Sequence, residues 1–342
     1  MDLTISNKWD QYLDSFEEGD KDLYYKEEYV KLYETDSEKG VCCIAKQGDN
    51  IMLFPYLERT FTYFGKTFHD FETAYGYGGP IFNFKDKEFQ KSALEESFDF
   101  LKRNDYICGF ARFHTLLRTH LAFSPSEVIF DRKTVAMDLT LSEDEIFTKE
   151  IHSKNRNVIR KAEKSGLQYI ADDKFEYLDE FILLYNGTLD KLSADEFYYF
   201  NNQYYRDFIK NIPNSFLGVV LLDGKVISAA IFMYEGIYGH YHLSGSDKGY
   251  LSYSPNNYML YKSALELKKR GVELFHLGGG TTSDENDSLF AFKKKFSPSL
   301  YGFYIGKVIF NHEFYSSICE KWEAENPEKA QRYGRFLLRY KY

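Results

Sequence analysis

Five basic residues lie within the segment from His152 to Lys164, which carries a single acidic residue. At helical spacing Arg160, Lys161 and Lys164 share one face of this segment with Asn157. Arginine binds phosphate through two parallel hydrogen bonds, so this face is a candidate cradle for phosphate groups. The alternative interpretation is the solvated face of an amphipathic helix.

Three consecutive glycines, Gly278, Gly279 and Gly280, follow an apolar stretch at 273–277 that is typical of a strand. Because they have no side chains, they let the backbone approach a ligand closely or adopt a positive φ. Consecutive backbone N–H groups at this point could bind an anion. The glycines are equally consistent with a tight exit from the strand.

A run of three lysines lies between Phe292 and Phe296. The two phenylalanines are four residues apart, so a helix would turn both toward the core. Lys293, four residues after Leu289, is then the lysine closest to the apolar side. Its ammonium could neutralise negative charge that develops on a carbonyl or phosphate oxygen. A lysine run is also typical of a solvated face.

The loop at 70–80 combines Tyr75 and Tyr77 with three glycines, among them Gly78. Such a loop can wrap a sugar or a peptide through ring stacking and hydroxyl hydrogen bonds. It can equally be a surface loop that is packed by its own aromatic rings.

The usual catalytic signatures are missing. The chain has no GxxxxGK[ST], GxSxG or HExxH motif, and no GxGxxG opens a helix after a strand, so P-loop, hydrolase and zinc-protease chemistry have no support. The four cysteines lack zinc-ligand spacing, and no metal site is predicted. His240 and His242 alternate along one predicted strand and share a face, which makes them the best candidates for a general base.

The composition is that of a folded protein of two domains, since the chain has 342 residues. The 43 basic and 52 acidic residues give a net charge of −9, which disfavours DNA as a partner but allows a local basic patch. No apolar stretch reaches the roughly 18–20 residues that cross a bilayer. Residues 1–20 are polar and acidic, unlike a signal peptide. We therefore expect a cytoplasmic protein with buried free thiols.

The predicted elements run in the same order in both halves of the chain: three strands, a helix and a strand. In the first half they lie at 41–46, 51–57, 61–64, 88–104 and 107–113, and in the second at 216–222, 226–234, 238–243, 254–270 and 273–277. Further helices are predicted at 151–164, 175–189 and 195–210. The order predicts two related α/β domains, 1–140 and 141–342, each with a mixed, mostly antiparallel sheet flanked by helices.

Five segments occur in the order found in the FemABX-like acyltransferases, which the chain resembles over roughly residues 5–310. They are Tyr75–Pro80, Ala111–His114, Asn155–Lys164, Leu277–Gly280 and Phe292–Phe296. This family is related to the GNAT superfamily and includes aminoacyltransferases that build peptidoglycan bridges and enzymes of surface-polysaccharide clusters. The resemblance implies tandem GNAT-like domains and transfer of an acyl group to an amine.

The resemblance also implies roles for individual residues. Lys293 would stabilise the oxyanion of the tetrahedral intermediate or the charge of the donor, and Arg156 and Arg160 would bind phosphates of the acceptor or donor. With His242 as the candidate base, the predicted catalytic residues are Lys293 and His242. The predicted substrate-binding residues are Arg156, Arg160, Tyr75, Tyr77, Gly78, Gly279 and Gly280.

The acyl donor stays open between aminoacyl-tRNA and acyl-CoA, and no tightly bound cofactor is expected. The stretch 168–214 is too short and too aromatic for the coiled-coil arm of one tRNA-dependent branch. The stretch Ser244–Tyr250 lacks the R/Q-x-x-G-x-G/A loop with which acyl-CoA members hold pyrophosphate.

The sequence thus predicts an N-acyltransferase that acts on an amine of a cell-wall or surface-polysaccharide precursor, either nucleotide-linked or lipid-linked. Acyl transfer from an activated ester needs orientation, a base and an oxyanion donor, but no covalent nucleophile. The alternative is a catalytically inactive module of the same fold that binds a glycan or peptide.

Overall fold

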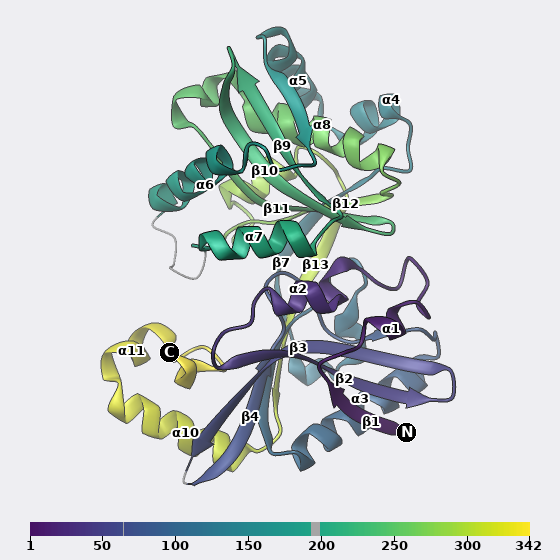
Figure 1. The fold of residues 1–342 in the computed structure, drawn as a ribbon, viewed down its shortest axis with the longest axis vertical. Helices are drawn as coiled ribbons and strands as arrows, with labels where there is room; N and C mark the ends of the chain where they lie inside the picture. The colour runs from purple at the N-terminus through teal and green to yellow at the C-terminus, as the bar shows by residue number, and fades with distance from the viewer. Residues whose placement is uncertain (64, 193–198) are drawn as a thin grey trace. The chain divides into compact units, whose positions relative to one another are not determined.

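The computed structural model describes residues 1–63, 65–192 and 199–342 (Figure 1). The chain divides into two compact units: unit 1 comprises Met1–Asp131 and Phe303–Tyr342, and unit 2 comprises Arg132–Gly302. The predicted domains 1–140 and 141–342 differ from this division, because residues 303–342 return to the first unit.

Unit 1 is built on a mixed sheet in which β4 and β6 run parallel and the other neighbours antiparallel. In spatial order its strands are β1 (Asp2–Ser6), β2 (Glu38–Gln47), β3 (Asn50–Tyr63), β4 (Lys66–Glu72), β6 (Tyr106–Arg112) and residues 303–309 of β13 (Leu300–Ile309). The short strand β5 (Ile81–Phe82) pairs with β3.

Helices cover both faces of the unit 1 sheet. Ala93 and Leu94 of α3 (Lys87–Arg103) pack in the core on one face. Ile318 of α10 (His312–Glu325) packs in a second cluster with Ile107 of β6. The remaining helices are short: α1 (Asp10–Leu13), α2 (Glu27–Lys31) and α11 (Pro327–Tyr333).

Unit 2 repeats this plan. In spatial order its strands are β8 (Gln168–Asp172), β9 (Ser215–Leu222), β10 (Lys225–Glu235), β11 (Tyr238–Ser246), β12 (Leu274–Gly279) and residues 132–138 of β7 (Val128–Asp138). Only β11 and β12 run parallel among the described pairs of this unit.

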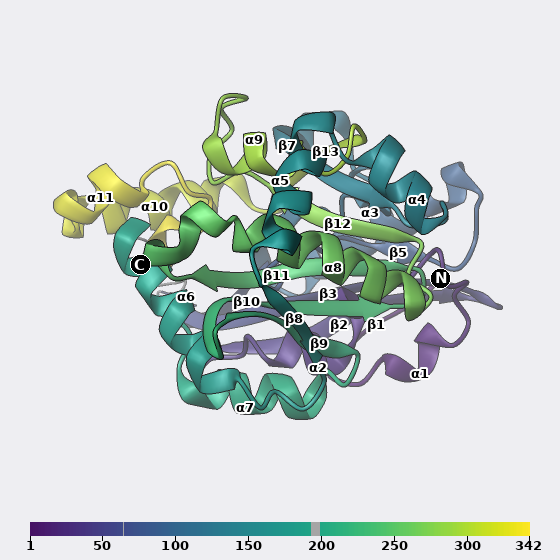
Figure 2. The ribbon, with the colours of Figure 1, turned by 90° about the horizontal axis from the view of Figure 1, so that it is seen from above.

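Helices lie on both faces of the unit 2 sheet. Helices α5 (Ser153–Lys164) and α8 (Pro255–Lys269) pack in one core with the short helix α9 (Ser288–Lys293). Figure 2 shows α6 (Leu178–Leu192) and α7 (Asn202–Asn211) on the opposite side of the strands. The helix α4 (Glu143–Glu145) precedes α5.

The two halves correspond in these sheets, but one predicted strand of the first half is misplaced: residues 61–63 of the predicted strand 61–64 belong to β3, and the third strand is β4. Strands β2, β3 and β4, helix α3 and strand β6 match β9, β10, β11, α8 and β12 in order, and in each unit the parallel pair flanks the matching helix. The predicted fold class, two mixed and mostly antiparallel sheets flanked by helices, is confirmed. The sixth strand of each unit comes from outside the repeat, β13 in unit 1 and β7 in unit 2.

The strand β13 explains the error in the predicted domain boundary. Its residues pair antiparallel with β6, with Ile305 opposite Arg112 and Ile309 opposite Cys108. Alternation along β13 shows that it is a strand but not which sheet it joins, so the sequence pattern could not assign it to the first unit.

Two local motifs adopt the conformation that their residue types favour. Asp223 and Gly224 both have positive φ, 50° and 78°, and join β9 to β10 in the hairpin turn that their types favour. Ser142 and Glu145 form a reciprocal capping box at α4. The predicted helix 195–210 begins outside the described residues, and α7 accounts for its later part.

All four cysteines are buried and free, as expected. Every helix in the described ranges is too short or too polar to cross a bilayer.

Candidate functional site

Lys293 is a buried cation at the C-terminal end of α9, with 7% of its surface exposed. Asp287 caps this helix through hydrogen bonds from the backbone N–H groups of Leu289 and Phe290 at 2.9 and 3.0 Å. The helical period then turns Phe290 and Lys293, three residues apart, toward the interior. The prediction that Lys293 is the lysine nearest the apolar side is confirmed, since Lys294 is exposed.

The lysine ammonium points at the glycine run. Its Nζ donates a hydrogen bond of 2.8 Å to the carbonyl oxygen of Gly279, and it lies 5.7 Å from the ring centre of Tyr241. Burial lowers the pKa of Lys293 from 10.5 to about 7; nearby Asp287 opposes this shift and Arg132 adds to it. Near neutral pH this amine can therefore hold or release a proton.

Neighbouring atoms leave no room for a side chain at two of the three glycines. A Cβ on Gly279 would lie 2.9 Å from the backbone oxygen of Lys133, and a Cβ on Gly280 would collide with the Asp287 carboxylate. Arg132 donates a hydrogen bond of 2.8 Å to the carbonyl of Gly280. Two successive carbonyls are thus held by two cations, and Gly278 and Gly279 are the last residues of strand β12, which extends beyond the predicted strand 273–277.

Asp287 organises the loop that follows the glycines. Its second carboxylate oxygen accepts from the backbone N–H and hydroxyl of both Thr281 and Thr282, at 2.6–3.2 Å. Burial would raise the pKa of Asp287, but the hydrogen bonds from Thr281, Phe290 and Thr282 outweigh it and hold the pKa well below its usual range. Asp287 is therefore a carboxylate at neutral pH.

The basic segment on α5 reaches the same part of unit 2 through Asn155. This buried side chain donates to the carbonyl of Lys295, two residues after α9, at 3.2 Å, and its oxygen accepts from Asn257 in the first turn of α8 at 2.7 Å. The three segments singled out in the second half of the sequence therefore converge on one face of the unit 2 sheet.

The two arginines of α5 have different surroundings. Nη1 of Arg156 donates to the backbone carbonyls of Thr148 and Ile151 at 2.9 and 2.8 Å, which fixes the turn before the helix. Arg160 is exposed, with its guanidinium 5.0 Å from the ring centre of Phe147. Arg160 is thus better placed than Arg156 to meet a phosphate.

His242 does not lie with Lys293. Its Nε2 is 3.1 Å from the hydroxyl of Tyr204, and its ring stacks on Phe208, both on α7. Tyr241, which contacts Lys293, packs in the core on the opposite face of the sheet, with α5 and α8. Burial and the neighbouring His240 lower the pKa of His242 to about 3, so it is a very weak base at neutral pH. The structure thus separates the two residues predicted as catalytic.

The loop with Tyr75, Tyr77 and Gly78 is tied to the interior of unit 1. The backbone of Gly78 donates to the carbonyl of Arg112 and accepts from the N–H of His114, both at 2.7 Å. A Cβ on Gly78 would lie 2.9 Å from the Thr73 side chain. This packing agrees with the interpretation of a loop held by its own contacts, and a role of these residues in substrate binding stays a prediction.

The turn between β11 and α8 is where acyl-CoA enzymes of this fold class would hold pyrophosphate. Here Asp247 accepts from the backbone N–H of Gly249 at 2.9 Å and pairs with Lys225 at 2.8 Å. The hydrogen bond from Lys225 lowers the pKa of Asp247, so a carboxylate occupies the N–H that an anion would use.

Sequence reasoning missed Asp287 and Arg132. An Asp directly before Ser288 and an apolar pair is a recognisable helix-cap signal, so Asp287 could have been found. Arg132 precedes the glycine run by about 150 residues, and only the pairing of β7 with β12 brings it there.

The comparisons with known proteins agree with this description. A family model described as an acetyltransferase (GNAT) domain matches residues 152–294. The UDP-N-acetylmuramoylpentapeptide-lysine N(6)-alanyltransferase of Weissella viridescens is 23% identical over 278 residues, which cover 75% of this chain and 81% of that protein.

Solved structures show the same fold. The crystal structure of FemX has a TM-score of 0.71 at 15% identity, covering 93% of this chain and all of that one. The structure of L-PGS from Bacillus licheniformis has a TM-score of 0.54 at 14% identity, covering 88% and 91%. A tandem GNAT protein from the clavulanic acid biosynthesis pathway has a TM-score of 0.50 at 8% identity, covering 91% and 99%.

Residues 152–294 thus form a GNAT-type acyltransferase domain, and the described chain has the fold of FemX. The chain is FemABX-like, and the resemblance predicted from its five ordered segments is confirmed.

Proposed function

We propose that this chain is an N-acyltransferase that moves an aminoacyl group from a charged tRNA to an amine of a nucleotide-linked or lipid-linked cell-wall precursor. The proposed acceptor class is supported by the similar protein of Weissella viridescens, whose name places the alanyl group on the lysine of a UDP-linked muropeptide.

The buried amine of Lys293 carries the proposal. A lysine that is buried and has its pKa lowered to about 7 costs folding free energy, and such groups cluster at functional sites. Among the described residues, the Lys293 ammonium donates one hydrogen bond, to the carbonyl oxygen of Gly279. Its other N–H groups can donate to a substrate oxygen.

The chemistry requires little else. The neutral acceptor amine attacks the ester carbonyl carbon of the donor, a C–N bond forms, and the carbonyl oxygen becomes an oxyanion. The Lys293 ammonium donates a hydrogen bond to that oxygen. When the C–O ester bond breaks, the ribose hydroxyl of the tRNA leaves with the proton lost by the attacking nitrogen.

The choice of tRNA over acyl-CoA rests on Asp247. Its carboxylate occupies the backbone N–H of Gly249 at the turn before α8, where a pyrophosphate would bring further negative charge. An ester of tRNA needs no pyrophosphate site at this turn. Arg160, exposed on α5, is the proposed contact for the phosphates of the acceptor.

The test is transfer by purified protein from charged tRNA to a UDP-linked muropeptide, followed by the mass of the acceptor. Lys293→Met should reduce transfer by at least about a hundredfold, the usual order for one oxyanion donor. Lys294→Met, the adjacent exposed lysine, is the matched control and should keep wild-type transfer. Equal activity of both variants would remove Lys293 from the mechanism, and acceptor binding without transfer from either donor would favour the inactive module.

A further inference from the structure

The segment 327–342 is strongly basic in an acidic protein. It carries five basic residues and one acidic residue, whereas the whole chain has a net charge of −9. Lys329, Arg332 and Arg335 are exposed in this segment, on helix α11 and the turn that follows it. A local concentration of positive charge on such a chain attracts an anionic partner to one place.

Aromatic rings lie between these cations. Tyr333 and Tyr342 stack with ring centres 4.3 Å apart and planes within 1° of each other. The Arg332 guanidinium lies 5.1 Å from the ring centre of Tyr333, and that of Arg335 lies 5.4 Å from that of Phe336. Phe336 and Tyr342 are 38% and 46% exposed, which is high for large rings. We call Lys329, Arg332, Tyr333, Arg335, Phe336 and Tyr342 together the basic–aromatic surface.

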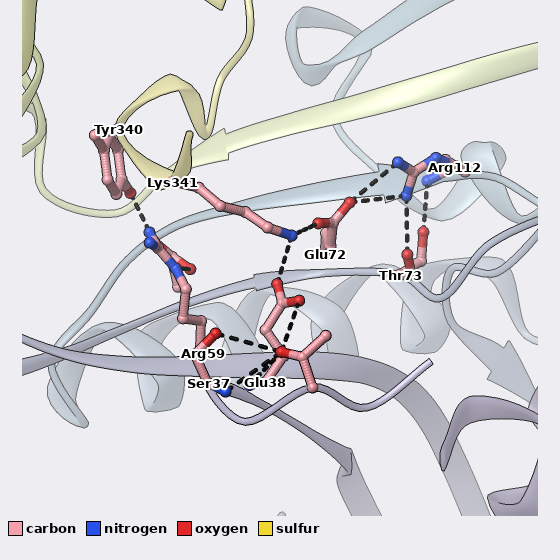
Figure 3. Close-up of polar contacts among 10 residues, drawn as sticks. Ser37, Glu38, Arg59, Glu72, Thr73, Arg112, Tyr340 and Lys341 are labelled. Atoms are coloured by element: carbon pink, nitrogen blue, oxygen red, sulfur yellow. Dashed lines mark hydrogen bonds and ion pairs between the residues drawn. The ribbon is translucent and has the colours of Figure 1, made fainter. Parts of the chain in front are cut away.

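The segment that carries the basic–aromatic surface is anchored through Tyr340 and Lys341, which Figure 3 shows with their polar contacts. Lys341 forms ion pairs with Glu38 of β2 and Glu72 of β4, and the hydroxyl of Tyr340 donates to Asp70 at 2.9 Å. Leu337 and Leu338 are buried in the cluster beneath α10. These anchors fix the backbone that carries the surface, so a ligand would find it already formed and would lose little binding free energy in ordering it.

We propose that the basic–aromatic surface binds RNA, with the exposed arginines on phosphates and the exposed rings stacked on unpaired bases. Cations interleaved with aromatic platforms are the means by which proteins hold single-stranded nucleic acid without reading its sequence. The inference rests on the proposed function in one respect, because it identifies the RNA as part of the tRNA that carries the acyl group.

A membrane surface fits the same residues less well. Binding in the plane of a bilayer requires an apolar face that enters the boundary between headgroups and acyl chains. Leu337 and Leu338 are buried instead, and α11 exposes Glu328, Lys329 and Arg332. The exposed rings of Phe336 and Tyr342 belong to one small ring cluster with Tyr333, with ring centres 4.3–6.0 Å apart, and charged residues of the same segment are exposed beside it.

The experiment measures the affinity of the full chain for uncharged tRNA by fluorescence anisotropy between 50 and 300 mM salt. The variant Lys329→Gln/Arg332→Gln/Arg335→Gln should bind about 10- to 100-fold more weakly at 100 mM. It should also lower the slope of log Kd against log salt by about 2–3, one for each lost phosphate contact. Phe336→Ala should weaken binding about 5- to 150-fold, with the slope unchanged.

The matched control is Lys91→Gln/Lys102→Gln/Arg103→Gln on α3, which removes the same charge from exposed positions of the same unit. Control binding like wild type, with loss in the surface variant, supports the proposal. Equal weakening in both overturns it, because net charge alone then explains binding. If the surface variant loses binding to vesicles that contain anionic lipid but keeps its binding to tRNA, the proposal is also overturned and the surface is assigned to membranes.

Transfer assays separate this inference from the proposed function. If wild type transfers from charged tRNA and the surface variant does so with unchanged kcat and KM, the surface inference fails and the proposed function stands. If wild type transfers only from acyl-CoA yet binds tRNA through the surface, the proposed donor fails and RNA binding stands.

Discussion

Replacing Lys293 by Met should make unit 2 more stable at pH 6 while it lowers transfer at least about a hundredfold. Met has a similar length and no charge, so the variant fills the same space without burying an ammonium. The wild-type protein carries the cost of that burial, since the pKa falls from 10.5 to about 7. At about 1.4 kcal/mol per tenfold change in proton affinity, the cost is about 5 kcal/mol when the lysine is charged in both states.

Lys293→Met also loses the hydrogen bond to Gly279, and this loss offsets part of the stabilisation expected from removing the buried charge. A bond from a charged donor contributes about 1.5–3 kcal/mol, and Met cannot make it. The expected net stabilisation at pH 6 is therefore about 2–3 kcal/mol.

The pH dependence gives the sign of the effect. The folded protein releases the Lys293 proton near pH 7 and the unfolded chain keeps it until about 10.5, so wild-type stability rises with pH between these values. At pH 9.5 about 1 kcal/mol of the cost remains, and the lost hydrogen bond, which then comes from a neutral amine, offsets a similar amount. The advantage of the variant should thus fall to about zero at pH 9.5.

Urea unfolding followed by circular dichroism at pH 6 and 9.5 measures this difference. Both tryptophans, Trp9 and Trp322, lie in unit 1, so fluorescence reports that unit separately and serves as an internal control. Lys294→Met should change neither transition. A Lys293→Met protein that is destabilised equally at both pH values would refute the reasoning, because the lysine would then be a stabilising ion pair with Asp287.

Three further perturbations test the site and its support. The kcat/KM of transfer should fall as pH rises through about 7, where Lys293 loses its proton. Asp287→Asn should move this fall to lower pH, because the carboxylate favours the ammonium form of Lys293. A kcat/KM that rises near pH 7 would make the lysine a base instead. Gly280→Ala should destabilise unit 2 by about 1–3 kcal/mol and impair transfer, since the new methyl group displaces Asp287; unchanged dichroism-detected unfolding would contradict this. Lys341→Met should destabilise unit 1 by about 2–4 kcal/mol, measured by tryptophan fluorescence, because the buried Glu38 loses its ion-pair partner; a change below about 0.5 kcal/mol would show that water replaces the lysine.

The sequence was sufficient for features that depend on neighbours in the chain. The hairpin at Asp223–Gly224 and the capping box at Ser142 follow from local backbone preferences, and both form. The position of Lys293 on the apolar side of α9 follows from its spacing to Leu289. Local patterns also identified the order of elements in the second half and, apart from strand β4, in the first half, and this order repeats because each half folds as the same supersecondary unit.

Features that depend on distant pairing could not be read in this way. Whether β13 joins the first or the second sheet depends on β6, almost 200 residues earlier. His242 is predicted as a base because it alternates with His240 along one strand, but one sheet can bury its two faces against different helices. The pKa of about 3 for His242 arises from burial beside α7, which no spacing in the sequence reveals.

The return of residues 303–342 to unit 1 reverses the order of folding during synthesis. The ribosome releases residues 1–131 first, yet the edge of β6 and the face beneath α10 stay open until the chain beyond residue 302 emerges. At about 5–20 residues per second, the intervening stretch of about 170 residues takes about 10–35 s. Unit 2 is complete before unit 1 has its last strand. The nascent chain therefore passes through a state in which its oldest part exposes an unpaired strand edge, a target for chaperones and for aggregation.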